Sequence, residues 1–128
     1  MTTPRILDSC VLIDVLRGHR GAVDLLVSII ESDDPAWSVA PVRTEILVGI
    51  RAGEKAAFDR FAATIVWVPV HADLADDAAE LAAPFIASHR GMDAVDMLLA
   101  ALAVRSRGTL HTLNVRHFPM LPGLAPAY

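Results

Sequence analysis

Apolar residues along the chain fall into two kinds of run. Short runs rich in Val, Ile and Leu predict strands, and longer runs with apolar residues three and four apart predict helices. The expected strands are 5–8, 37–40, 64–70 and 109–113, and the expected helices are 9–17, 22–31, 41–52, 54–63, 72–88 and 93–107. This alternation predicts an α/β fold, one domain over residues 1–128, with a mostly parallel central sheet flanked by helices.

Proline and glycine mark several of the expected boundaries. Pro41 fits the first position of its helix, where a missing N–H costs nothing. Pro84 lies inside the helix expected over 72–88 and could bend it. Gly108 is expected to end the helix before the last strand.

Two polar residues follow expected strands. In open parallel sheets, ligands bind beyond the carboxyl ends of the strands, which makes Asp8 and Asn114 candidates for a site. Each also has a local explanation. Asp8 stands where it would cap the next helix, and Asn114 stands where asparagine commonly makes a turn.

The most informative feature is the presence of acidic residues within apolar helices. Asp96 has Leu99 and Ala100 as neighbours one turn onward, so its carboxylate is costly unless it is hydrogen-bonded, paired or bound to metal. A simpler explanation is that a first-turn acid complements the helix dipole.

Glu45 is placed in a similar way. Its neighbours Val42, Val48 and Gly49 are apolar, and the alternative to a functional role is an ion pair, with Arg43 or another arginine as partner.

The carboxylates mean more together than singly. Asp8, Glu45 and Asp96 gathered at one end of a sheet would repel one another, and a hard divalent cation bound through oxygen relieves that repulsion. Such a site can activate water for phosphodiester hydrolysis.

Composition narrows the range of functions. Hydrophobic residues make up 54% of the chain, and the formal net charge is −4, which argues against broad, non-specific binding of nucleic acid. It does not exclude a nucleic-acid enzyme whose metal supplies positive charge. The longest apolar run, Met97 to Val104, is too short to span a membrane, and Cys10 is the only cysteine. A reducing cytoplasm fits these features.

Other candidates carry weaker signals. His111 and His117 have no spacing typical of a metal pair and are expected to be surface or structural groups. Cys10 is expected in the core, and Asp14 is expected to pair with an arginine or face solvent.

Four stretches, in order and correctly spaced, resemble the motifs of VapC-type PIN-domain toxins. They are LDSCVLID at 7–14, TEILVGI at 44–50, DMLLAALA at 96–103 and LHTLNVRHF at 110–118. None of the four is specific alone, but the series covers nearly the whole chain. In two respects the chain is noteworthy: Asn114 stands where many members carry Asp, and Asp93 adds an acid whose role is open beyond a possible helix cap.

The resemblance implies a cytoplasmic toxin of a type II toxin–antitoxin system. It implies a PIN fold, Mg²⁺ or Mn²⁺ bound by Asp8, Glu45 and Asp96, with Asn114 as a fourth catalytic position. It further implies endonucleolytic cleavage of RNA, often structured RNA such as tRNA, a homodimer, and a cognate antitoxin whose tail occupies the site groove.

Two questions stay open on the sequence alone. The general base could be Asp96 or Glu45, and arginines could hold the RNA backbone. The alternative function is a catalytically weak PIN-fold binding module that acts with its antitoxin on operator DNA.

Overall fold

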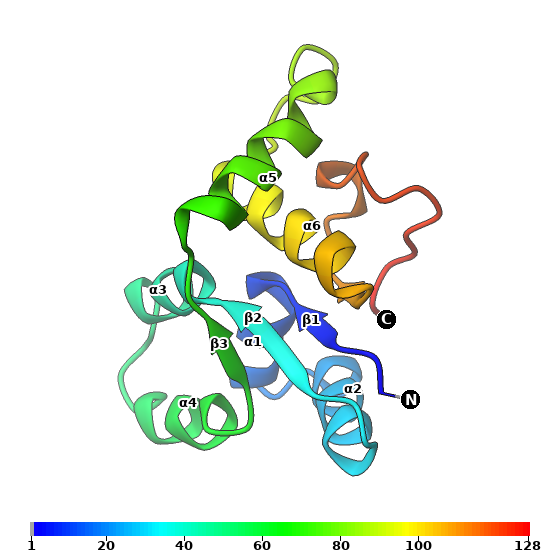
Figure 1. Ribbon diagram of the computed structural model, residues 1–128. Helices are drawn as coiled ribbons and strands as arrows, with labels where there is room; N and C mark the ends of the chain where they lie inside the picture. The colour runs from blue at the N-terminus through cyan, green and yellow to red at the C-terminus, as the bar shows by residue number, and fades with distance from the viewer. Residues whose placement is uncertain (1) are drawn as a thin grey trace.

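The computed structural model describes residues 2–128 and contains one parallel sheet (Figure 1). Its strands stand in the order β3-β2-β1-β4, and they are β1 (Arg5–Leu7), β2 (Ala36–Val39), β3 (Val66–Val68) and β4 (Thr109–His111). All three strand pairs are parallel. The predicted α/β fold with a parallel central sheet is confirmed.

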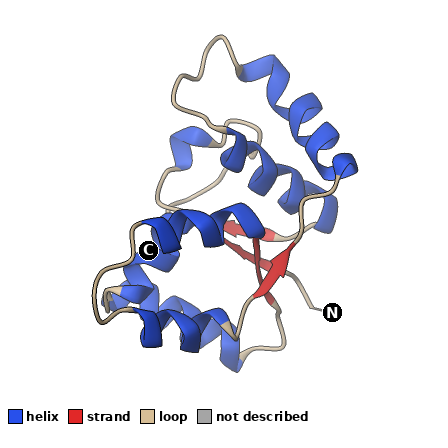
Figure 2. Cartoon of the chain, turned by 90° about the vertical axis from the view of Figure 1, so that its left-hand side faces the viewer, coloured by secondary structure: helices blue, strands red, loops and turns tan. Residues whose placement is uncertain are grey.

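Helices cover both faces of this sheet. In Figure 1, α5 and α6 lie above the strands while α2 and α4 lie below them, and the turned view of Figure 2 shows the strands between the same two groups. The helices are α1 (Ser9–Leu16), α2 (Arg20–Glu31), α3 (Ala40–Val48), α4 (Lys55–Ala62), α5 (Ala72–Ala82) and α6 (Ala94–Ser106), with short 3-10 helices η1 (Ala83–Phe85) and η2 (Val115–His117). No helix within residues 2–128 is long and apolar enough to cross a bilayer.

The central strand explains why the apolar run at its position is continuous. β1 pairs with β2 on one side and β4 on the other, and both Ile6 and Leu7 are completely buried. A strand covered on both faces has no side that needs polar residues. Asp8, which comes next, therefore stands at the edge of a tightly packed core.

Several elements are shorter than predicted. The helix expected over 41–52 ends at Val48, with Gly49 as its C-cap, and the helix expected over 72–88 ends at Ala82. Pro84 is responsible for the second difference, because its ring cannot continue α-helical hydrogen bonding and the chain passes into η1. The strand expected over 64–70 pairs only over Val66–Val68. It begins late because Thr64 and Ile65 donate backbone hydrogen bonds back to the end of α4, and it ends where its partner β2 ends at Val39.

Gly108 has a different role from the one expected. Arg107, not Gly108, takes the left-handed conformation at the end of α6, with φ 55°. A Cβ on Gly108 would lie 2.7 Å from the backbone oxygen of Pro4. Glycine is required there because the chain passes very close to the start of β1, and this approach brings β4 beside β1.

Candidate functional site

Asp8 is held on both carboxylate oxygens at the carboxyl end of β1. Oδ1 accepts a hydrogen bond from the Ser9 N–H (2.7 Å), and Oδ2 accepts one from the Thr112 hydroxyl (2.7 Å). Only 3% of the residue is exposed. The capping role expected from the sequence is thus present, but Asp8 is also clamped across the sheet by the residue that follows β4.

Thr112 links Asp8 to the next part of the chain. Thr112 is fully buried. Its hydroxyl donates a hydrogen bond to Asp8 and accepts one from the Asn114 N–H (3.0 Å). Asn114 precedes η2 without a side-chain capping bond, and it is exposed. The backbone of Asn114 is therefore connected to the Asp8 carboxylate by two successive hydrogen bonds, with the Thr112 hydroxyl between them.

Asp96 and Asp93 form a capping box at the start of α6. The Asp96 N–H donates to Asp93 Oδ1 (2.9 Å), and the Asp93 N–H donates to Asp96 Oδ2 (3.1 Å). This assigns Asp93 the capping role that the sequence left open. Such reciprocal bonds satisfy N–H groups that the helix itself cannot pair.

The environment of Asp96 works against its negative charge. The pKa of its carboxyl is raised to about 6, mainly by burial. The hydrogen bond from the Asp93 N–H and the nearby His117 oppose the rise, and the charges of Asp93 and Asp8 add to it. The side chain is only 8% exposed. Asp96 is thus a buried acid with like charges around it, as the apolar helix pattern indicated.

His117 contacts Asp96 directly, which the sequence did not predict. Its Nδ1 lies 3.1 Å from Asp96 Oδ2. From the sequence, His117 was expected to be a surface or structural group, because the irregular segment after β4 has no periodicity from which contacts can be inferred. Its place in the same motif as Asn114 was the only available signal.

Glu45 differs from the sequence expectation in two ways. It is exposed rather than buried, and within residues 2–128 it forms no ion pair. The Arg43 guanidinium instead lies over the rings of Phe58 (5.0 Å) and Trp67 (5.3 Å). Partial desolvation by the surrounding protein raises the pKa of Glu45, and the charges of Asp93, Asp8 and Asp96 add to the rise.

These carboxylates come from three different elements and act on one another electrostatically. Asp8 follows β1, Glu45 lies on α3, and Asp96 lies on α6. The charges of Asp8 and Asp96 both raise the pKa of Glu45. In the arrangement of residues 2–128, however, no three His, Cys, Asp or Glu side chains are close enough to hold a metal ion together. The donors are all carboxylate oxygens, which hard divalent cations prefer.

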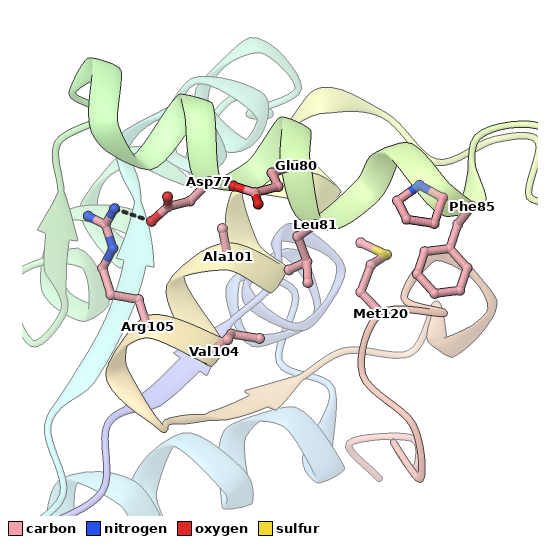
Figure 3. Close-up of a pocket in the computed structure, with 9 residues that line it drawn as sticks. Asp77, Glu80, Leu81, Phe85, Ala101, Val104, Arg105 and Met120 are labelled. Carbon is pink, nitrogen blue, oxygen red and sulfur yellow. Dashed lines mark hydrogen bonds and ion pairs between the residues drawn. The ribbon is translucent and has the colours of Figure 1, made fainter.

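A cavity away from the carboxylates lies between α5, α6 and Met120. It has a volume of about 640 Å³, and Leu81, Phe85 and Val104 contribute apolar walls (Figure 3). Arg105 at its rim forms ion pairs with Asp73 and Asp77. None of the carboxylates described above lines it, so it is separate from the candidate site.

A second cavity adjoins Glu45. It measures about 500 Å³, and Glu45 lies in its lining beside Pro41, Thr44, Val70 and Val95. Glu45 therefore faces a mostly apolar hollow between α3, the segment after β3 and the start of α6.

The remaining polar candidates have structural partners. Burial and the charge of Arg5 lower the pKa of His111 to about 4, and its Nε2 accepts a hydrogen bond from Arg5 Nε (2.8 Å). Burial and the charge of Asp8 raise the pKa of the Cys10 thiol. Asp14 is half-buried and accepts a hydrogen bond from the Tyr128 hydroxyl (2.6 Å). Of the two alternatives expected for it, an arginine partner or solvent, the arginine partner is wrong within residues 2–128.

Comparison with known proteins places this arrangement in a family. The PIN domain model matches residues 5–119. Ribonuclease VapC19 from Mycobacterium tuberculosis is 40% identical over 124 residues, covering 97% of this chain and 99% of that protein. Ribonuclease VapC10 from the same organism is 35% identical over 123 residues, covering 96% and 92%.

Solved structures agree with the fold. A toxin–antitoxin complex from Klebsiella pneumoniae matches with a TM-score of 0.76 and 22% identity, covering 97% of this chain and 98% of that one. VapBC2 from Rickettsia felis, bound to a DNA fragment from their promoter, matches with a TM-score of 0.79 and 17% identity, covering 97% of each chain. The sequence motifs, the parallel sheet and the full-length relatives agree, and the chain belongs to the PIN-domain family, among its VapC-type ribonucleases.

Proposed function

We propose that this ribonuclease is an Mg²⁺- or Mn²⁺-dependent endoribonuclease in which Asp8, Glu45 and Asp96 hold the cation. The observation that carries this proposal is the mutual effect of the acids, since the charges of Asp8 and Asp96 raise the pKa of Glu45. Proteins seldom gather like charges without a compensating partner, and a divalent cation is the partner that suits oxygen donors.

The three acids differ in how firmly they are held. Asp8 and Asp96 are fixed by hydrogen bonds from Ser9, Thr112 and Asp93. Glu45 is exposed and accepts no hydrogen bond from residues 2–128. We therefore expect Asp8 and Asp96 to form a fixed pair, and Glu45 to complete the site by a change of its side-chain torsions.

The chemistry follows from this division. When bound, the cation would polarise a phosphate oxygen of RNA and lower the pKa of water. Glu45 and Asp96 both have a raised pKa, which suits a group that accepts a proton from the attacking water. Asn114, at the end of β4, would contribute its amide oxygen beside Asp8.

Cleavage of an RNA pool tests the proposed activity. The purified protein should cut RNA, structured RNA such as tRNA included, in Mg²⁺ or Mn²⁺, lose activity in a chelator and recover it when the ion is restored. No cleavage at any concentration of either ion, together with binding of operator DNA in the presence of an antitoxin, would favour the binding-module alternative.

We also propose that the protein is the toxin of a cytoplasmic toxin–antitoxin pair and forms a homodimer. The antitoxin partner is supported by two proteins that share its fold, one from a toxin–antitoxin complex of Klebsiella pneumoniae and one from VapBC2 of Rickettsia felis. Co-expression with the product of the adjacent gene should suppress growth inhibition and yield a co-purified complex. Light scattering should give the mass of two chains for the free protein.

Metal affinity should fall in acid. Metal ligands must be deprotonated, and burial raises the pKa of Asp96 to about 6, so binding is complete above about pH 7 and weakens below pH 6. The expected loss is about tenfold for each pH unit below 6, for one displaced proton. Calorimetric titration with Mn²⁺ at several pH values measures it. Equal affinity at pH 5 and pH 7 would remove Asp96 from the ligand set.

Asn114→Asp should raise Mn²⁺ affinity without abolishing activity. The substitution adds a carboxylate of nearly the same size beside a site whose Asp8 is linked to Asn114 through Thr112. More negative charge should bind the cation more tightly. Calorimetric titration of the wild type and the variant decides the matter, and unchanged affinity in a folded variant would show that Asn114 is a turn residue only.

A further inference from the structure

His117 makes a polar contact with Asp96, and the chemistry proposed above assigns no role to this contact. His117 ends η2, and its side chain is 35% exposed, whereas that of Asp96 is 8% exposed. The histidine therefore reaches in from the surface to a nearly buried carboxylate. Its backbone is held by the bond from its own N–H to the Asn114 carbonyl (2.9 Å).

Both polar contacts of the Asp96 carboxylate are made by the same oxygen. The Asp93 N–H donates a hydrogen bond to Oδ2 (3.1 Å), and His117 Nδ1 lies within ion-pair distance of the same atom (3.1 Å). No hydrogen bond from residues 2–128 reaches Oδ1, and that atom is not sealed from solvent. The carboxylate thus has one anchored oxygen and one that is free to bind a ligand.

The imidazole has little freedom of its own. Its other nitrogen, Nε2, lies beside Gly91, where an added Cβ would be 3.6 Å away. The next residue, Phe118, is 1% exposed and fixes the chain in the core. A ring held between a loop and a carboxylate can orient that carboxylate.

We propose that His117 is a positioning residue that anchors Oδ2 of Asp96, so that Oδ1 is presented to the cation together with Asp8 and Glu45. The inference rests on the metal site proposed above. A carboxylate that is already oriented loses less side-chain freedom when it binds an ion, and partners of this kind typically contribute about 10–100-fold to metal affinity.

Two substitutions distinguish the two ring nitrogens. In His117→Asn the amide nitrogen stands near the position of Nδ1, so a polar contact with Asp96 Oδ2 can be kept. In His117→Gln the amide nitrogen stands near the position of Nε2, so that contact is lost although size and polarity are similar. Thermal melting without metal establishes that both variants fold.

The measurements are Mn²⁺ affinity by calorimetry and RNA cleavage as a function of Mg²⁺ concentration. His117→Gln should bind Mn²⁺ about 10–100-fold more weakly than the wild type, and His117→Asn should stay within a few-fold of it. Saturating Mg²⁺ should restore cleavage by the Gln variant, because its defect lies in holding the ion.

Three results would overturn the inference. Equal affinity in the wild type and both variants would show that the contact positions nothing, while leaving the metal site intact. A cleavage defect in both variants that saturating Mg²⁺ does not restore would make His117 a catalytic residue instead. A wild-type protein that binds no Mn²⁺ would overturn the metal site and this inference together.

Discussion

Asp96→Asn should reduce RNA cleavage at least about a hundredfold and abolish growth inhibition, while the protein remains folded. The substitution removes the charge of a proposed metal ligand and changes almost nothing in shape. The remaining amide oxygen can still accept the hydrogen bond that the Asp93 N–H donates to Oδ2 in the wild type, and it keeps the contact with His117. The start of α6 should therefore stay capped.

The folded state of this variant should be at least as stable as that of the wild type without metal. Burial raises the pKa of Asp96 to about 6, so at neutral pH its ionised form opposes folding, and an uncharged amide avoids that penalty. Cleavage of an RNA pool and thermal melting measure the two effects. Asp24→Asn is the matched control, because Asp24 is exposed and paired only with Arg20 on α2. A fully active Asp96→Asn protein at limiting Mg²⁺ would show that Asp96 is not a ligand.

Leu99→Ala should lower the free energy of unfolding by about 2–5 kcal/mol, the range for truncating a buried leucine to alanine. Leu99 is completely buried on α6, one turn beyond Asp96. Removing most of its side chain leaves a cavity beneath the helix that carries Asp96. Urea unfolding measures the change.

Val104→Ala provides the comparison for Leu99. Val104 lies on the same helix but is 53% exposed, so its loss should change stability by less than about 0.5 kcal/mol. Similar unfolding midpoints for the two variants would mean that α6 is not packed as the structure shows.

The order of strands and helices could be predicted because each kind of buried element leaves its own pattern of apolar residues in the sequence. Strands covered on both faces require unbroken apolar runs, and the run before Asp8 marked both β1 and its end. The lengths could not be predicted in the same way. β3 ends where β2 offers no further residue for pairing. The sequence of one strand does not reveal the length of the strand beside it.

Glu45 shows what helical periodicity leaves undecided. Periodicity identifies the residues that share a face of α3, but not whether another element covers that face. Val48, an apolar neighbour of Glu45 on α3, is 82% exposed, and Glu45 is exposed with it. Asp96 was the more informative acid, because its helix is buried over most of its surface.

The contacts of the irregular segments were beyond sequence reasoning. His117 meets Asp96 and Tyr128 meets Asp14 through turns whose path is set by the packing of Phe118 and the end of β4. No repeat of apolar and polar positions encodes such a path. The contact between His117 and Asp96, which sequence reasoning missed, lies in this segment.

The position of β4 beside β1 also sets the order in which the protein becomes complete during synthesis. The ribosome releases a chain from its N-terminus, and Thr112 follows Asp8 by 104 residues. Asp8, Glu45 and Asp96 have therefore all been translated before Thr112 and His117, the side chains that hold two of them. A nascent chain that does not yet include β4 and η2 has the three acids but not the contacts that orient two of them, so the proposed metal site cannot be complete before both of these elements have been translated.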